Sequence, residues 1–114
     1  MSSTHEHTRL VNETRLDLGM EPDFTMWLNA KVTYVDGQPR AKPGLGKGSS
    51  DLIGILSPAG RIVALEAKTG DAKPTKEQVL FMALIRKRGG FAAIFHTVEE
   101  ARAALDRARN GMHE

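Results

Sequence analysis

The chain has 114 residues, of which 40% are hydrophobic and 26% charged, and its formal net charge is +2. This length and composition predict a single globular domain over residues 1–114 and exclude a disordered polymer. The lack of cysteine excludes a disulfide framework and a thiolate zinc site. No apolar run approaches the roughly 18 residues of a membrane helix, and no signal-peptide pattern opens the sequence. We therefore expect a cytoplasmic protein without a membrane partner, slightly basic and so permissive of a polyanionic partner.

The first third of the chain predicts a helix and then a strand. The helix is expected over residues 4–18, because its apolar stripe recurs at helical spacing: Leu10, Val11, Thr14 and Leu18. Alternating residues over 24–35 predict extended chain that ends at a turn, Asp36-Gly37. The following segment, "GQPRAKPGLGKGSS", is rich in glycine, proline and basic residues, and this composition predicts a surface loop.

Two apolar runs in the middle of the chain predict a hairpin. Leu52–Leu56 and Arg61–Ala67 are separated by "SPAG", which is typical of a compact turn. After the second run, Thr75 and Gln78 have the spacing of a capping box and predict a helix that reaches about residue 88. Both faces of the hairpin are mostly apolar, so we expect helices to cover it on both sides.

A last strand and a last helix complete the predicted fold. Phe91–Phe95 is a short apolar run, and residues 97 to about 109 predict a helix with a possible capping box at its start. The predicted order is αβββαβα. This order is typical of an α/β fold in which a central mixed sheet, with the hairpin in its middle, lies between helices.

Three charged residues are predicted to meet at the open end of the hairpin. If "SPAG" closes the hairpin symmetrically, opposed residue numbers sum to 117, and Asp51 lies opposite Glu66 with Cβ atoms about 4.5–5.5 Å apart. Lys68 points to the same face. The repulsion between the two carboxylates would be offset by a shared proton, by Lys68 or by a divalent cation, and oxygen ligands suit Mg²⁺ or Mn²⁺. The alternative is a solvated strand end with Asp51 as a turn residue.

Five segments in this order resemble the PD-(D/E)XK nuclease superfamily, and most closely its virus-type replication-repair nuclease (VRR-NUC) branch. They are "NETRLDLGMEPDFTMW" from residue 12, "GSSDLIG" over 48–54, "LEAK" over 65–68, "PTKEQ" over 74–78 and "RGGFAAIFHTVEEA" over 88–101. The resemblance covers about residues 10–108. Family members often read W-R-N in the first strand, whereas this chain reads Trp27-Leu28-Asn29. The contact that the arginine makes is therefore expected to be missing or to come from the basic loop.

The resemblance implies a restriction-endonuclease-like core and a metal-dependent endonuclease that hydrolyses phosphodiester bonds in DNA. Asp51, Glu66 and the backbone carbonyl of Ala67 would hold Mg²⁺ or Mn²⁺, which polarises the scissile phosphate and acidifies a bound water. Lys68 would orient or help deprotonate that water and stabilise charge on the phosphate. Branched, flap or junction DNA is the implied substrate, in replication or repair, in the cytoplasm of a bacterial or phage-infected cell.

The two helices nearest these residues would complete the site. The resemblance selects Glu13 as a carboxylate that reaches the metal directly or through water, although Glu6 lies on nearly the same flank of the helix. Gln78 would steady the cluster, or it acts only in the capping box with Thr75. We interpret His5 and His7 as parts of a frayed N-terminus, with a metal-binding pair as the alternative.

The loop before Asp51 is the predicted DNA-binding surface, because a glycine-rich loop can approach phosphates closely. Its candidate contacts are Arg40, Lys42, Lys47, Ser49 and Ser50. A homodimer is expected, since so small a domain covers little DNA and stand-alone relatives pair. The alternative to an enzyme is a module that binds nucleic acid or another partner, retains the nuclease fold and does not catalyse.

Overall fold

A four-stranded mixed sheet forms the centre of the molecule. The computed structural model describes residues 3–29, 32–41 and 45–114. The sheet has the order β1-β4-β5-β6, formed by β1 (Phe24–Leu28), β4 (Leu52–Leu56), β5 (Arg61–Ala67) and β6 (Phe91–Phe95). The first two pairings are antiparallel and β5–β6 is parallel, because a helical crossover returns the chain before β6 begins. The expected α/β fold with a mixed sheet is confirmed.

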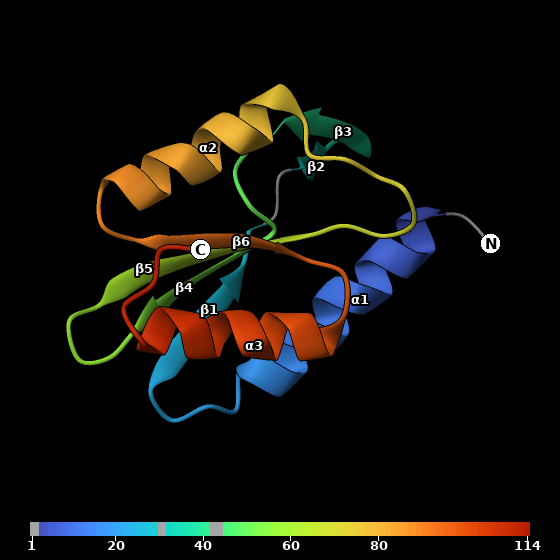
Figure 1. The fold of residues 1–114 in the computed structure, drawn as a ribbon. Helices are drawn as coiled ribbons and strands as arrows, with labels where there is room; N and C mark the ends of the chain where they lie inside the picture. The colour runs from blue at the N-terminus through green and yellow to red at the C-terminus, as the bar shows by residue number, and fades with distance from the viewer. Residues whose placement is uncertain (1–2, 30–31, 42–44) are drawn as a thin grey trace.

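Helices lie on both faces of this sheet (Figure 1). α1 (Ser3–Leu18) and α3 (Val98–Arg109) pack against each other on one face, and α2 (Lys76–Lys87) covers the other. The larger core lies between the sheet and the pair α1 and α3. Its largest fully buried apolar side chains are Phe91, Phe95, Leu18, Leu52, Leu65 and Leu105. No helix within the described residues has the length and apolarity that crossing a bilayer requires.

α2 covers only part of the sheet face on which it lies. The expectation of a hairpin covered on both sides by helices is therefore corrected. Its core is the small cluster of Ala64, Met82 and Ala92 with partly buried neighbours. α2 packs on β5 and β6, so Ile55 and Ile62 remain 38% and 37% exposed. A single helix of 12 residues is too narrow to cover four strands.

A second, smaller hairpin was missed in the predicted order. β2 (Val32–Val35) and β3 (Gln38–Ala41) pair antiparallel in a sheet of their own, with Val35 opposite Gln38. Asp36 and Gly37 connect them with φ of 52° and 77°, the left-handed conformation of a two-residue turn that matches strand twist. The start of the predicted loop is therefore β3, and the predicted strand over 24–35 is two strands. The Asp-Gly pair was the signal for this hairpin.

The predicted register of the central hairpin is confirmed. Leu56 lies opposite Arg61 and Leu52 opposite Leu65, so each pair sums to 117. The ladder ends at Leu52. Asp51 and Glu66 therefore lie at the same end of the hairpin, where β4 begins and β5 finishes.

Ion pairs of Arg109 link α3 to the chain just before β1, at the end of this strand that lies away from Asp51. The Arg109 guanidinium donates to both carboxylate oxygens of Asp23 at 2.8 and 2.7 Å, and to Glu21 at 2.8 Å. These hydrogen bonds hold the pKa of the Asp23 carboxyl below its ordinary value. The connection from α1 to β1 is thus fastened at the end of the sheet away from Asp51.

Gly48 provides a test of how closely the loop before β4 packs on α2. Its φ is +85°, and a Cβ there would lie 2.5 Å from backbone atoms of Glu77. Gly46 has a φ of +91°, with no described heavy atom within 4 Å of such a Cβ. We predict that Gly48→Ala lowers the free energy of unfolding by about 2–4 kcal/mol, from left-handed strain plus overpacking, and that Gly46→Ala costs about 1–2 kcal/mol from strain alone.

Chemical denaturation of both variants measures this difference. Equal losses in the two variants would contradict the close approach of the loop to α2.

Candidate active site

Asp51 is tied directly to the segment of β5 that carries Glu66. The Asp51 side chain is 12% exposed, and its Oδ2 accepts a hydrogen bond of 2.9 Å from the backbone N–H of Ala67. Ala67 lies beyond the last paired residues of the β4–β5 ladder, so the carboxylate takes the place of a backbone acceptor. This hydrogen bond brings the Asp51 carboxylate to the backbone of the residue that follows Glu66.

Glu66 is a buried carboxylate, 2% exposed, and a glutamine and a lysine are among its polar partners. Gln78 donates from Nε2 to Glu66 Oε2 at 2.8 Å, and Lys68 Nζ lies 3.4 Å from the same oxygen. Burying an unpaired carboxylate is strongly unfavourable, whereas a cation and an amide donor offset the loss of water. The expected proximity of Glu66, Lys68 and Gln78 is therefore present in the structure.

Gln78 has both of the roles that the sequence left open. Its backbone N–H donates to Thr75 Oγ1 at 3.1 Å, and its Oε1 accepts from the Thr75 N–H at 2.9 Å. This reciprocal capping box confirms the predicted start of α2. The side-chain amide has its Nε2 left for Glu66, so one residue both begins the helix and holds the carboxylate.

The first helix brings His7 to the site. His7 Nε2 lies 3.2 Å from Asp51 Oδ2, whereas Glu13 and Glu6 are both exposed. Glu13 is six residues from His7, about 240° around the helix, so the two side chains cannot share a face. The structure therefore brings His7, and not the expected Glu13, next to Asp51, and His7 lies within α1 and not in a frayed end. Helical spacing was the missed signal, because His7 precedes the buried Val11 by four residues.

Asn29 was also missed, and it fastens the loop that leads to Asp51. Its Nδ2 donates to Ser49 Oγ at 2.7 Å and to the Ser50 carbonyl at 2.9 Å, and its N–H donates to the Asp51 carbonyl at 2.8 Å. Ser49 and Ser50 are 2% and 1% exposed. The prediction that their side chains contact DNA does not fit this burial, since the two serines belong to the packed base of the loop.

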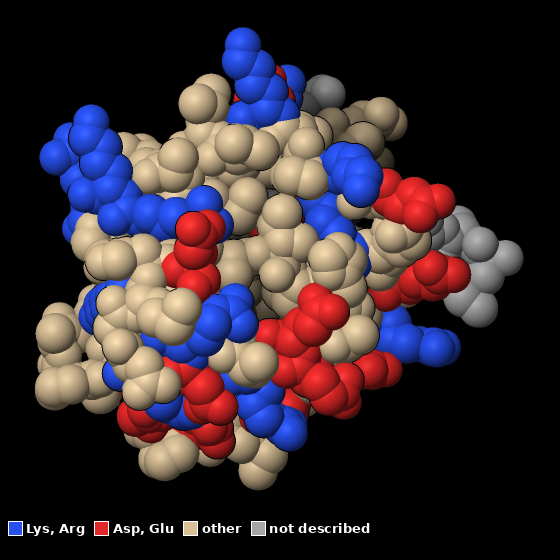
Figure 2. Space-filling view, viewed as in Figure 1, with Lys and Arg blue, Asp and Glu red and all other residues tan. Residues whose placement is uncertain are grey.

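The basic residues of this loop are described only in part. Lys47 is 86% exposed, with Nζ 3.9 Å from Glu77 Oε2, so its ammonium is at the surface. Lys42 and the side chain of Arg40 lie outside the described part of the structure. Figure 2 shows a second group of basic side chains over the C-terminal end of α2, where Arg86 and Lys87 lie. Arg86 already donates to the carbonyl of Ala92 at 2.7 and 3.1 Å.

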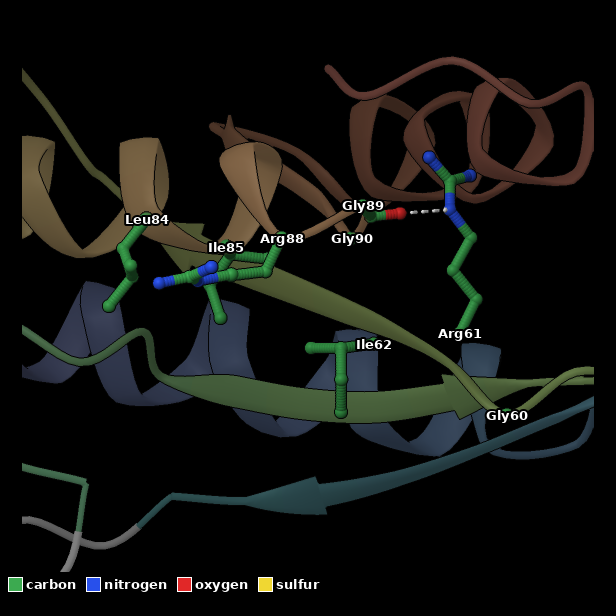
Figure 3. Close-up of a pocket in the computed structure, with 8 residues that line it drawn as sticks. All are labelled: Gly60, Arg61, Ile62, Leu84, Ile85, Arg88, Gly89 and Gly90. Carbon is green, nitrogen blue, oxygen red and sulfur yellow. Dashed lines mark hydrogen bonds between the residues drawn. The ribbon is translucent and has the colours of Figure 1, made fainter.

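A separate groove of about 550 Å³ lies at the other end of β5, away from Glu66 (Figure 3). Leu84 and Ile85 of α2 lie on one side of it and Ile62 on the other, and Arg61 donates to the carbonyl of Gly89 at 3.0 Å. This groove is mostly apolar. It has no acidic lining residue and does not belong to the candidate site.

The donor set at the hairpin end fits a hard divalent cation that keeps part of its water. Within the described residues, no three or more His, Cys, Asp or Glu side chains converge as a complete metal cage. Mg²⁺ is commonly held by only one or two carboxylates, and water and substrate phosphates complete its octahedron. Asp51, Glu66 and the neighbouring Ala67 carbonyl carry oxygen donors of this type.

Comparison with known proteins provides no further assignment. No protein-family model matches this sequence. No curated protein matches it either.

The ion pair between Lys68 and Glu66 gives a stability prediction. Lys68 is 12% exposed and Glu66 is 2% exposed. We predict that Lys68→Met lowers the free energy of unfolding by about 3 kcal/mol, because it removes a cation 3.4 Å from a buried carboxylate. Adding Glu66→Gln should recover most of this loss, since removal of both charges is often neutral.

Urea denaturation of the single and double variants provides the measurement. Lys47→Met is the matched control, because Lys47 is 86% exposed and its removal should leave the unfolding midpoint essentially unchanged. A Lys68→Met variant as stable as Lys47→Met would argue against a buried pair.

Proposed function

We propose that this protein is a metal-dependent DNA endonuclease with a restriction-endonuclease-like core, of the VRR-NUC type that its motifs resemble. The observation that supports this most directly is the buried Glu66, in contact with Lys68 and Gln78 at the end of the hairpin where Asp51 also lies. A surface decoration would leave these side chains in water. Desolvation of a carboxylate next to an amine and a second acid is typical of functional sites, where it tunes reactivity.

A Mg²⁺ or Mn²⁺ ion would supply Lewis-acid polarisation of the scissile phosphate and a more acidic bound water. Asp51, Glu66 and the Ala67 carbonyl would bind it. The Ala67 N–H holds the Asp51 carboxylate in place, and Gln78 does the same for Glu66, so both ligands are oriented before an ion arrives. This preorganisation lowers the reorganisation needed during the reaction.

Lys68 would act on the phosphate and the attacking water. Its ammonium has three donors, so it can remain beside Glu66 at 3.4 Å while another N–H reaches a phosphate oxygen. A cation in a largely water-excluded position stabilises developing negative charge more than an exposed one does. Lys68 therefore contributes to turnover while the carboxylates bind the metal.

The proposed substrate is DNA, with branched, flap or junction structures as the class that the resemblance implies. The basic segment of Arg40 in β3, Lys42 and Lys47 would contact the DNA backbone, and a homodimer would present two such sites. The alternative function is a module that binds nucleic acid without cleaving it. The following experiments distinguish it from a nuclease.

Asp51→Asn is the first test of the enzyme. An amide oxygen at residue 51 can still accept from the Ala67 N–H, so the fold should persist, but the site loses one charge. We predict that cleavage of plasmid DNA with Mg²⁺ or Mn²⁺ falls by about 10³-fold, the effect of losing several kcal/mol of transition-state stabilisation. The metal-induced rise in melting temperature should shrink in parallel, while DNA binding in EDTA is retained.

Two further variants make this test specific. Lys68→Ala should retain the metal-induced rise in melting temperature and lose turnover, although its baseline stability falls. Asp71→Asn, at an exposed acid in the loop after β5, is the matched control and should cut normally. Cleavage by Asp51→Asn at the wild-type rate would refute the nuclease proposal.

The basic loop gives a separate prediction about DNA binding. Each phosphate contact contributes a slope of about −0.9 to the dependence of log K on log salt concentration. We predict that replacing Arg40, Lys42 and Lys47 by alanine makes this slope shallower by up to about 2.7 in the same plot. Arg102→Ala, at a residue of α3 paired with Asp17, should leave the slope unchanged. An unaltered slope in the triple variant would remove this loop from the DNA-binding surface.

A further inference from the structure

A cleft lies on the α1 side of Asp51. Glu66, Lys68 and Gln78 do not line it. It encloses about 190 Å³ between α1 and the end of β1, and it is lined by His7, Thr8, Val11, Asn12, Leu28 and Asp51. Since a water occupies about 30 Å³ in the liquid, this volume has room for several. A hydrated ion would fit beside the Asp51 carboxylate.

The distance between His7 and Asp51 suits two ligands of one ion. In an octahedral site with bonds of about 2.1 Å, adjacent donor atoms lie about 3.0 Å apart. His7 Nε2 and Asp51 Oδ2 share a hydrogen bond of 3.2 Å, so both atoms could bind one ion if that hydrogen bond breaks and the ring turns toward the ion. The backbone of the helix sets this approach, because His7 is on the face of α1 that turns Val11 toward the core.

The chemistry of imidazole then decides which ion is preferred. Mg²⁺ is a hard cation that prefers oxygen ligands, whereas first-row transition ions also accept an imidazole nitrogen. A carboxylate from the first helix, as the family resemblance implied, would not discriminate in this way. His7 is the residue of α1 that contacts Asp51.

We propose that His7 is a nitrogen ligand of the ion held by Asp51, and that it makes the site select Mn²⁺ over Mg²⁺. This inference rests on the proposed nuclease function, because it concerns the same ion. His7 and Asp51 would provide two protein ligands, and water and a substrate phosphate would provide others.

Pulsed electron paramagnetic resonance of the full chain with Mn²⁺ tests this ligand directly. A coordinated imidazole couples its ¹⁴N nucleus to the electron spin of the ion. The wild-type complex should show this coupling, and His7→Gln should lose it. His5→Gln is the matched control and should retain it, because His5 is exposed on the same helix, about 200° away from His7.

Calorimetric titration with Mn²⁺ and with Mg²⁺ measures the selectivity. His7→Ala should weaken Mn²⁺ binding by about 10–100-fold and Mg²⁺ binding by a few-fold at most, as expected when a ligand suited to one ion is lost. His7→Glu should shift the preference toward Mg²⁺. These readouts do not depend on DNA cleavage.

The outcomes separate the two proposals. Bound Mn²⁺ without ¹⁴N coupling, in a protein that cuts DNA, would overturn the role of His7 and leave the nuclease intact. Coupling in the wild type that persists in His7→Gln would also overturn it. A wild-type protein that binds neither ion would refute the ligand role and the metal-dependent nuclease together.

Discussion

The carboxylate of Glu66 is buried, with only 2% of the residue exposed to solvent. The surrounding structure depends on how its charge is neutralised. Lys68, just after β5, and Gln78, in α2, contribute to this neutralisation. Because Gln78 also closes the capping box with Thr75, the start of α2 and the buried acid stabilise each other. Gly48 lets the preceding loop approach the same turn of the helix.

The two faces of the sheet differ in how much apolar surface they bury. α1 and α3 cover the larger apolar core, whereas the α2 face buries few large side chains and leaves Ile55 and Ile62 partly exposed. α2 is therefore held to a considerable degree by polar contacts at its ends. Such an arrangement makes the position of Gln78 sensitive to the charge state of Glu66, since their hydrogen bond is one of those contacts.

Asp51 connects these two layers. It accepts from the Ala67 N–H within the sheet and lies 3.2 Å from His7 of α1, so its carboxylate is within reach of donors from a strand and from a helix on the other face. Asn29 fixes the chain on the N-terminal side of Asp51 through three hydrogen bonds. In the proposed enzyme, this support keeps an acidic ligand in place where the inner strand β4 begins.

The sequence by itself determined the features that depend on neighbouring residues. The "SPAG" turn and the alternation of its flanking strands set the hairpin register, and the Thr75–Gln78 spacing predicted the capping box. Asp36-Gly37 carried the signal for the missed hairpin. Because turns and caps are local, such patterns can be recognised without the rest of the chain.

Only the tertiary structure decided which helix residue meets Asp51, since His7 lies 44 positions away in the chain. It also decided that Ser49 and Ser50 are buried and that α2 leaves part of the sheet exposed. These outcomes depend on how whole elements pack against one another. A pattern along one helix predicts a face, but the partner of that face is set by the relative positions of helix and sheet.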